Sequence, residues 1–299
     1  MKNGKLLEYT ADASIILISL IWGSTFIIIK KGVDTFEPIT YLFLRFMVAS
    51  VFLFIITLPL MKKINRKLLK DGIILGSVLF IVFLFQTLAL KLATATEVGF
   101  LTGLYVLFVP VFSALILKKY PHMFSVLGVL LSAAGMMMVT LESSIGLSTG
   151  QIFGIINALF LGLYIILIDV YSRRHHVVLL TTVQILTATV LAGVYSWLFE
   201  EQNYSAALDP YMLYTILFTG LIATVFCFFV QTAMQKHTTP TKAAIMFTLE
   251  PISSAFFSFF IGGEILNSRQ YFGAALIVIA ILVAEAGTAM RYSVKKLHR

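Results

Sequence analysis

The sequence predicts an all-α integral membrane protein, with ten transmembrane helices arranged as two inverted five-helix repeats. Three observations predict this fold class. The 299-residue chain is 59% hydrophobic and 12% charged, whereas about a quarter of the residues in a soluble globular domain are charged. Its apolar residues are gathered into runs of about 20, the length of helix that crosses the hydrocarbon core of a bilayer. Short stretches of the first half also recur in the second half in the same order.

The apolar runs define ten spans along the chain. Because every backbone polar group must be hydrogen-bonded internally in lipid, and because the runs lack the alternation of strands, each run is expected to form a helix. The spans are predicted at about 12–30, 36–59, 71–91, 95–117, 122–141, 150–171, 177–199, 209–235, 240–262 and 268–290. The first run follows Lys2 and Lys5, but no small-residue cleavage site comes after it, so we interpret it as a retained span instead of a signal peptide.

The positive charges are unequally divided between the two sides of this arrangement. An even number of spans places both termini on one side. Of the 22 Lys and Arg residues, Arg45 falls inside a span and four (Lys30, Lys31, Lys91 and Arg269) fall opposite the termini, which leaves 17 on the side of the termini. Because cytoplasmic segments carry the excess of basic residues, both termini are predicted to be cytoplasmic, in a plasma or bacterial inner membrane. The net charge of +8 therefore reflects topology and does not indicate nucleic-acid binding.

The chain also resembles itself. QTLALK at 86–91 recurs as QTAMQK at 231–236, an offset of 145, and Arg45 falls opposite Gln184 at an offset of 139. Each half contains five spans, an odd number, so the second half enters the membrane from the opposite side. This arrangement is an inverted-topology repeat, which many secondary transporters have. The alternative is that similar helix composition alone produces the matches. The two repeats are predicted at 1–145 and 146–299.

Four stretches together resemble a known family. They are WGSTFIIIK at 22–30, YLFLRF at 41–46, GFLTGLYVLFVPVFSAL at 99–115 and LEPISSAFFSFFIGGEIL at 249–266. In this order and spacing they resemble the EamA-type transporters of the drug/metabolite transporter superfamily, over nearly the whole chain. The resemblance implies ten helices around a central cavity and the export of amino acids, metabolites or toxic compounds without ATP. One departure is that the second half has no counterpart of WGS, since it reads FLGLYIIL around Gly162.

Two charged residues fall deep inside predicted spans, Arg45 in the second and Glu250 in the ninth. A charge at the centre of a membrane helix costs roughly 2.5–3.5 kcal/mol, so neither is expected to face lipid. Each lies about ten residues into its span, and we therefore predict that the two form an electrostatic couple. Arg45 either binds a substrate carboxylate or fixes the packing of helices. Glu250 either carries a coupling proton or is a hydrogen-bonded acid beside a kink at Pro251.

Uncharged polar and aromatic residues complete the predicted substrate pathway. Amide side chains within spans either bond to neighbouring helices, at about 0.6–2 kcal/mol each, or contact substrate. Gln86 and Gln231 are favoured for substrate contact because the repeat relates them. The hydrated cavity is predicted between the first, second, fourth, sixth, eighth and ninth spans. The predicted pathway residues are Trp22, Arg45, Gln86, Tyr105, Asn157, Tyr164, Gln184, Gln231 and Glu250.

Several other chemistries lack their motifs in this sequence. It has no GxxxxGK[ST] for ATP, no HExxH or Cys/His cluster for a metal, and no GxSxG for a serine nucleophile. Its one cysteine, Cys227, cannot form a disulfide framework. We therefore predict that the protein is not an enzyme and has no cofactor and no metal. The expected partners are a small-molecule substrate and the lipid bilayer, and a monomer suffices because the two halves are fused.

These inferences converge on a secondary-active transporter that exports small organic solutes by alternating access. Exchange of phosphorylated or nucleotide-linked metabolites is the alternative among transporters. It would need several inward-facing Lys or Arg residues, and the spans offer only Arg45. A membrane enzyme or a non-transporting sensor is the alternative from another class, and the missing catalytic motifs and the missing soluble domain argue against it.

Overall fold

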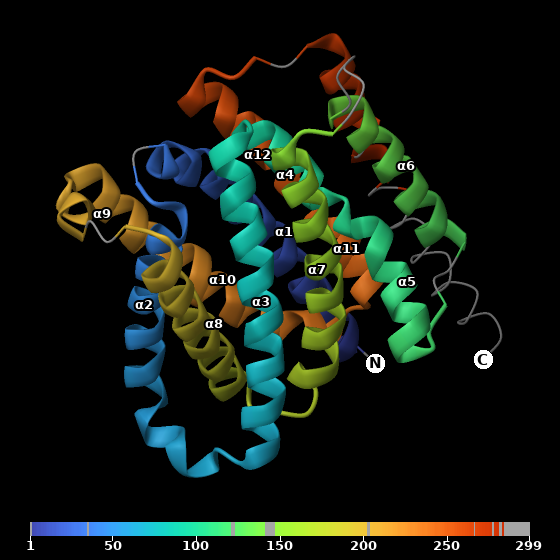
Figure 1. The fold of residues 1–299 in the computed structure, drawn as a ribbon. Helices are drawn as coiled ribbons and strands as arrows, with labels where there is room; N and C mark the ends of the chain where they lie inside the picture. Colours follow the sequence, from blue (N-terminus) through green and yellow to red (C-terminus); the bar gives the residue numbers. More distant parts are fainter. Residues whose placement is uncertain are drawn as a thin grey trace.

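The protein folds into a bundle of helices (Figure 1). The computed structural model describes residues 2–34, 36–120, 123–140, 147–201, 204–265, 267–276, 278–280 and 283. Every regular element within these residues is a helix, as the all-α fold class requires. The same residues include eight helical stretches that are long and apolar enough to cross a membrane.

The helices follow the predicted spans closely, and three of the spans are divided into consecutive segments. The undivided helices are α1 (Lys2–Val33), α2 (Pro38–Thr57), α3 (Arg66–Leu92), α6 (Met123–Thr140), α7 (Thr149–Ser172) and α8 (Val177–Phe199). The divided spans are α4 (Ala95–Gly103) with α5 (Tyr105–Leu117), then α9 (Pro210–Leu217) with η3 (Phe218–Phe226) and α10 (Cys227–Met234), and finally α11 (Pro240–Phe247) with α12 (Leu249–Phe257) and η5 (Ser258–Gly262). Short 3₁₀ segments are η1 (Leu58–Lys63), η2 (Tyr204–Leu208) and η4 (Gln235–His237).

The count of ten spans stays a prediction. The predicted fifth span, 122–141, corresponds to α6, and both predicted ends lie outside the described residues. The predicted tenth span, 268–290, extends beyond the described residues, and residues 268–276 within it are helical. The predicted boundary between the two repeats, at 145 and 146, also lies outside the described residues.

Polar side chains fix where several helices begin. The Asn65 side chain accepts a hydrogen bond from the Leu68 amide at the start of α3, at 2.9 Å. Thr94 caps α4 in the same way, and Ser148 forms a reciprocal capping box with Gln151 at the start of α7. Each cap bonds an amide that has no partner inside its own helix, so the helices begin at the polar breaks of the sequence.

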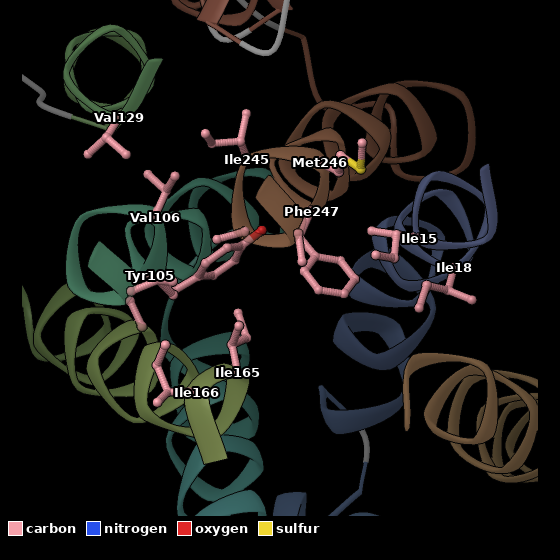
Figure 2. Packing of buried hydrophobic residues seen from close by; sticks show 14 of the residues in the cluster. Ile15, Ile18, Tyr105, Val106, Val129, Ile165, Ile166, Ile245, Met246 and Phe247 are labelled. Carbon is pink, nitrogen blue, oxygen red and sulfur yellow. The ribbon is translucent and has the colours of Figure 1, made fainter. Parts of the chain in front are cut away.

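The long helices pack around two apolar clusters. In Figure 1, α3 lies between α7 and α8, and α8 packs against α2. Side chains of α1, α5, α7 and α11 form the first cluster, where Figure 2 shows Tyr105 and Phe247 in the interior. The second cluster joins α2, α3, α7, α8 and α10. The ring of Trp22 packs against both clusters, so α1 lies at their junction.

Candidate functional site

A pocket opens at this junction, inside the bundle, and its empty space together with the adjoining open solvent amounts to about 420 Å³. Six of the nine predicted pathway residues line it: Trp22, Arg45, Gln86, Tyr164, Gln231 and Glu250. The structure adds six further lining residues: Thr25, Leu79, Val82, Phe83, Leu161 and Phe228. The wall is thus mostly apolar and aromatic, with a few convergent polar groups, which is the usual composition of a small-molecule site.

The helices that line the cavity differ from the prediction in two respects. Four lining residues come from α3, the third span, which was not expected to contribute. The fourth span, which was expected to contribute, provides no lining residue. Its candidate Tyr105 instead packs inside the first apolar cluster, because α5 is turned toward α7 and α11.

Four aromatic rings form a continuous part of the cavity wall. The ring centre of Phe228 lies 5.2 Å from that of Trp22, 5.9 Å from that of Phe83 and 6.0 Å from that of Tyr164. Tilted and edge-on pairs at such distances contribute about 0.5–1.5 kcal/mol each beyond the burial of their area. The sequence could not single out Phe83 and Phe228, because it contains 26 Phe residues in similar apolar runs.

Arg45 is almost fully buried, with 1% of its surface exposed. Its Nε donates to Oγ1 of Thr224 at 2.8 Å. Its guanidinium carbon lies 4.6 Å from the ring centre of Phe83 and 5.7 Å from that of Phe46, which are cation–π distances. Within the described part of the chain, its terminal amino groups form no hydrogen bond or ion pair, and Arg45 lines the cavity.

Glu250 is the acidic residue of the cavity and is 5% exposed. It lies in the first turn of α12, after the break between α11 and α12 at Thr248. Pro251 has no amide to continue the helix and clashes with the carbonyl four residues earlier, which accounts for this break. Among the described residues, the Glu250 carboxylate has no hydrogen-bond or ion-pair partner.

The predicted couple between Arg45 and Glu250 is not formed as an ion pair. Both residues are described, and no nitrogen and oxygen of the two side chains lie within 4.0 Å. The physical reason is that Thr224 and Phe83 already hold the guanidinium on its own side of the cavity. The guanidinium and the carboxyl group therefore line one cavity without contacting each other.

The two amides that the sequence repeat relates, Gln86 and Gln231, both line the cavity. Gln231 Nε2 donates to Oε1 of Gln235 at 3.0 Å, and Gln235 Nε2 donates to the carbonyl of Ile165 at 2.7 Å. Oε1 of Gln231 is buried and has no partner among the described residues. One acceptor at the cavity is therefore available to a hydrogen-bond donor.

The three remaining candidates support the cavity from outside it. Asn157 Nδ2 donates to the carbonyl of Val82 at 2.8 Å and so ties α7 to α3. Gln184 Oε1 accepts from the hydroxyl of Tyr164 at 3.0 Å and so orients a lining ring. The hydroxyl of Tyr105 is buried without a partner among the described residues. These amides join neighbouring helices, the alternative considered for them from sequence.

The helix that faces Arg45 is irregular. In η3 the amide of Cys227 donates to the carbonyls of Ile222 and Thr224 instead of the Ala223 carbonyl that an α-helix would use. The Ala223 carbonyl accepts from Nε1 of Trp22 at 2.8 Å. Two lining side chains, Trp22 and Arg45, are thus bonded to this π-helix, and no sequence motif predicted it.

Two carboxylates bind helix N-termini on the face where α2 and α4 begin. Oxygens of Glu200 accept from the amides of Ile39 and Thr40, at 2.8 and 2.6 Å. Oxygens of Glu264 accept from the amides of residues 95 and 96, at 3.2 and 3.1 Å. Burial raises the pKa of Glu200, although the bonds from Ile39 and Thr40 act in the opposite direction. Each carboxylate thereby ties the start of one helix to a segment far away in the sequence.

Comparison with known proteins finds relatives along almost the whole chain. Residues 10–141 and 148–285 match the EamA-like transporter family. An uncharacterized transporter of Archaeoglobus fulgidus is 32% identical over 275 residues, which cover 92% of this chain and 85% of that protein. The uncharacterized transporter YoaV of Bacillus subtilis is 24% identical over 276 residues, which cover 90% of this chain and 94% of YoaV. One solved crystal structure, 19% identical, matches with a TM-score of 0.76 over 92% of this chain and 98% of its own, and at this identity the match shows the fold alone.

Proposed function

This chain belongs to the EamA-like transporter family, and we propose that it is a secondary-active transporter that exports small organic solutes by alternating access. It is a multi-pass membrane protein, since it combines this family membership with eight long apolar helices in the described residues. The observation that carries the proposal is a guanidinium and a carboxyl group that line one cavity without contact. Arg45 and Glu250 both line this cavity, and neither neutralises the other by contact.

The two separated charges indicate the chemistry of the solute. An ion removed from water costs several kcal/mol unless a partner compensates it. A zwitterion could offer a carboxylate to the terminal amino groups of Arg45, in two parallel hydrogen bonds, and an ammonium group to Glu250. The rings of Trp22 and Phe228 would receive its apolar part, at about 0.8 kcal/mol per buried CH₂ group. Amino acids and related metabolites combine these groups. Phosphorylated metabolites suit the cavity less well, because Arg45 is the one cation among the lining residues.

Glu250 is also the residue that we propose for coupling. Without a bonding partner in the described part of the chain, its carboxylate can take up either a proton or the ammonium group of the solute. Competition between the two at one site would link proton movement in one direction to solute movement in the other.

Alternating access needs two halves that can exchange conformations, and we propose the inverted repeat for this role. The close approaches of glycines support it. A Cβ at Gly23 would lie 2.5 Å from the carbonyl oxygen of Glu250, and a Cβ at Gly162 would lie 3.5 Å from that of Tyr105. An offset of 139 relates Gly23 to Gly162, and an offset of 145 relates Tyr105 to Glu250. Each contact between the halves is thus the counterpart of the other.

Two further glycine contacts between the halves are also counterparts of each other. A Cβ at Gly76 would collide with the carbonyl oxygen of Gln184, and a Cβ at Gly220 would lie 3.0 Å from that of Arg45. Arg45 and Gln184 are the residues that the sequence related at an offset of 139. Each of these glycines lies in the third span of one half and meets the second span of the other.

Polar contacts repeat the pattern at the ends of the helices. Lys242 Nζ donates to Asp12 Oδ2 at 2.7 Å, and Gln151 Nε2 donates to Glu97 Oε1 at 2.6 Å. The same two offsets relate Asp12 to Gln151 and Glu97 to Lys242. The hydroxyls of Ser50 and Thr189, which are equivalent positions at an offset of 139, bond directly to each other at 2.6 Å.

Transport by purified protein in liposomes tests the proposed function. With an imposed proton gradient, the wild type should accumulate labelled zwitterionic amino acids, and the corresponding carboxamides should be poor substrates because they have no carboxylate for Arg45. Protein-free liposomes and the variant Arg45→Met are the controls. Transport of phosphorylated metabolites without any amino acid would overturn the zwitterion proposal and favour the exchanger instead.

A further inference from the structure

The π-helix η3 presents one hydroxyl to the buried guanidinium at the cavity. We propose that Thr224 is a positioning residue, which aims the terminal amino groups of Arg45 at the anionic group of the solute, and that the π-helical register of η3 places it there. This inference rests on the proposed function for its substrate. It extends that function to a residue outside the cavity wall.

The hydrogen bonds of Thr224 fix the direction in which it can act. Its Oγ1 donates to the carbonyl of Thr219, five residues earlier, at 2.8 Å. A hydroxyl has one proton to donate, so toward Arg45 the same oxygen acts as acceptor, and it receives Nε at 2.8 Å. Nε is thereby occupied, and the two terminal amino groups remain for a ligand. These are the groups that form two parallel bonds with a carboxylate.

The face of the guanidinium is held as well as its edge. The ring of Phe83, from α3, lies 4.6 Å from the guanidinium carbon. Thr224 on the edge and Phe83 on the face together leave the guanidinium little freedom to rotate. A charged group that is fixed before binding loses less conformational entropy when the ligand arrives.

The π-helical register of η3 results from one additional residue in the second half, relative to the equivalent helix of the first half. Gly76 and Gly220 make equivalent approaches at an offset of 144, whereas the lining residues Gln86 and Gln231 are related at an offset of 145. The second half therefore has one more residue between its two landmarks than the first half. A single inserted residue is absorbed in a helix as a π-bulge, and such bulges are frequent at functional sites. The π-helix η3 begins at Phe218, just before the first of these landmarks in the second half, and ends at Phe226, between the two.

A second hydrogen bond, between Tyr41 and Thr219, also joins α2 to η3. Because Oγ1 of Thr219 donates to the carbonyl of Thr215, the Tyr41 hydroxyl is the donor in its 2.7 Å bond to Thr219. Tyr41 lies one turn before Arg45 on α2. Gly220 permits this close approach, since a Cβ there would lie 3.0 Å from the Arg45 carbonyl oxygen.

Substitution of Thr224 tests the proposal in proteoliposomes. Thr224→Val keeps the shape and removes the hydroxyl. We expect it to raise the KM for a zwitterionic amino acid by about tenfold, the scale of one hydrogen bond to a charged group, with little change in maximal rate. Thr224→Ser should restore the KM. The matched control is Thr215→Val, which removes a buried hydroxyl from the same span. Among the described residues, that hydroxyl bonds only the Tyr211 carbonyl. Equal KM values for Thr224→Val and Thr215→Val would overturn the proposal.

A measurement without substrate separates this inference from the proposed function. The Nε–H resonance of Arg45, assigned in ¹⁵N-arginine-labelled protein by its loss in Arg45→Lys, should exchange slowly with water in the wild type. Thr224→Val should speed this exchange at least tenfold, and Thr215→Val should not. If wild-type liposomes transport no amino acid, the proposed function fails and this resonance alone decides whether Thr224 holds Arg45. Unchanged exchange in Thr224→Val would reject the positioning role.

Discussion

At the scale of residues, the two charges of the cavity are stabilised in unequal ways. Arg45 has a hydroxyl acceptor and an aromatic face, whereas the carboxylate of Glu250 has no bonding partner in the described residues. An unpaired buried charge destabilises the protein by several kcal/mol. A residue that remains in such a position points to a use of the charge other than stability.

Replacing Glu250 by Gln should therefore separate stability from coupling. The amide keeps the shape of the side chain and cannot ionise, so the melting temperature in detergent should stay the same or rise. Accumulation driven by a proton gradient should be lost, and exchange of labelled for unlabelled solute should persist. Glu37→Gln is the control, because Glu37 is an exposed carboxylate outside the cavity. Full gradient-driven accumulation by Glu250→Gln would contradict the coupling role.

The depth of a residue in the membrane could be predicted from the sequence, but the side of the helix on which its side chain lies could not. Gln86, Gln184 and Gln231 all lie within apolar spans, and at 1.5 Å per residue their depth follows from a count along the helix. Gln86 and Gln231 line the cavity, while Gln184 lies behind Tyr164. Helices that are apolar on every side carry no stripe that tells which side faces the interior. For the same reason Tyr105 was assigned to the cavity although it belongs to the apolar cluster.

At the scale of elements, α1 and α12 approach each other closely at Gly23. A Cβ at this position would lie 2.5 Å from the Glu250 carbonyl oxygen and would also collide with Ser253. We expect Gly23→Ala to destabilise the protein by about 1–3 kcal/mol, the usual effect of overpacking, and to impair transport. Gly32→Ala is the matched control on the same helix, because the nearest atom there would be 3.6 Å away. Measurement of chemical or thermal unfolding in detergent compares them, and equal stability would refute the tight approach.

The attachment of α2 to α8 should depend on pH through Glu200. Burial raises the pKa of Glu200 above its ordinary value of 4.5, so between these two values the folded protein holds a proton that the unfolded chain has lost. Its contribution to stability should thus fall as the pH rises through that interval. Glu200→Gln should flatten this part of the profile of melting temperature against pH. A profile identical to that of the wild type would show that Glu200 does not titrate in this way.

The bounds of elements were predicted well where polar residues interrupt the chain. The spans 95–117 and 240–262 coincide with the ends of α4–α5 and α11–η5. A kink at Pro251 was considered for the span 240–262, whereas the interruption inside the span 95–117 was not predicted, and neither was η3. A π-helix needs one extra residue and no particular motif, so the sequence alone does not locate it. The extra residue is recognised once the structure shows that Gly76 and Gly220 make equivalent contacts.

At the scale of the whole molecule, the proposed orientation can be tested at one loop. We predict that residue 205 lies outside the cell, on the 17-to-4 division of basic residues. A Ser205→Cys variant, made with Cys227→Ser, should react with a membrane-impermeant thiol reagent in intact cells. A cysteine introduced at Lys67 provides the control, since it should react only after lysis. The reverse pattern would invert the orientation.

The bond between Ser50 and Thr189 has a geometric consequence for the transport cycle. Under the proposed exchange, each half adopts in one state the shape that the other half has in the opposite state. When the halves exchange shapes, the distance between two residues that the repeat does not relate takes the value that their two counterparts had before. The distance between two residues that the repeat does relate, such as 50 and 189, stays the same. Spin labels at 50 and 189 should therefore report one constant separation throughout turnover. Labels at 12 and 242 should exchange their distance distribution with labels at 97 and 151. The constant separation of the labels at 50 and 189 is the reference for measuring this exchange.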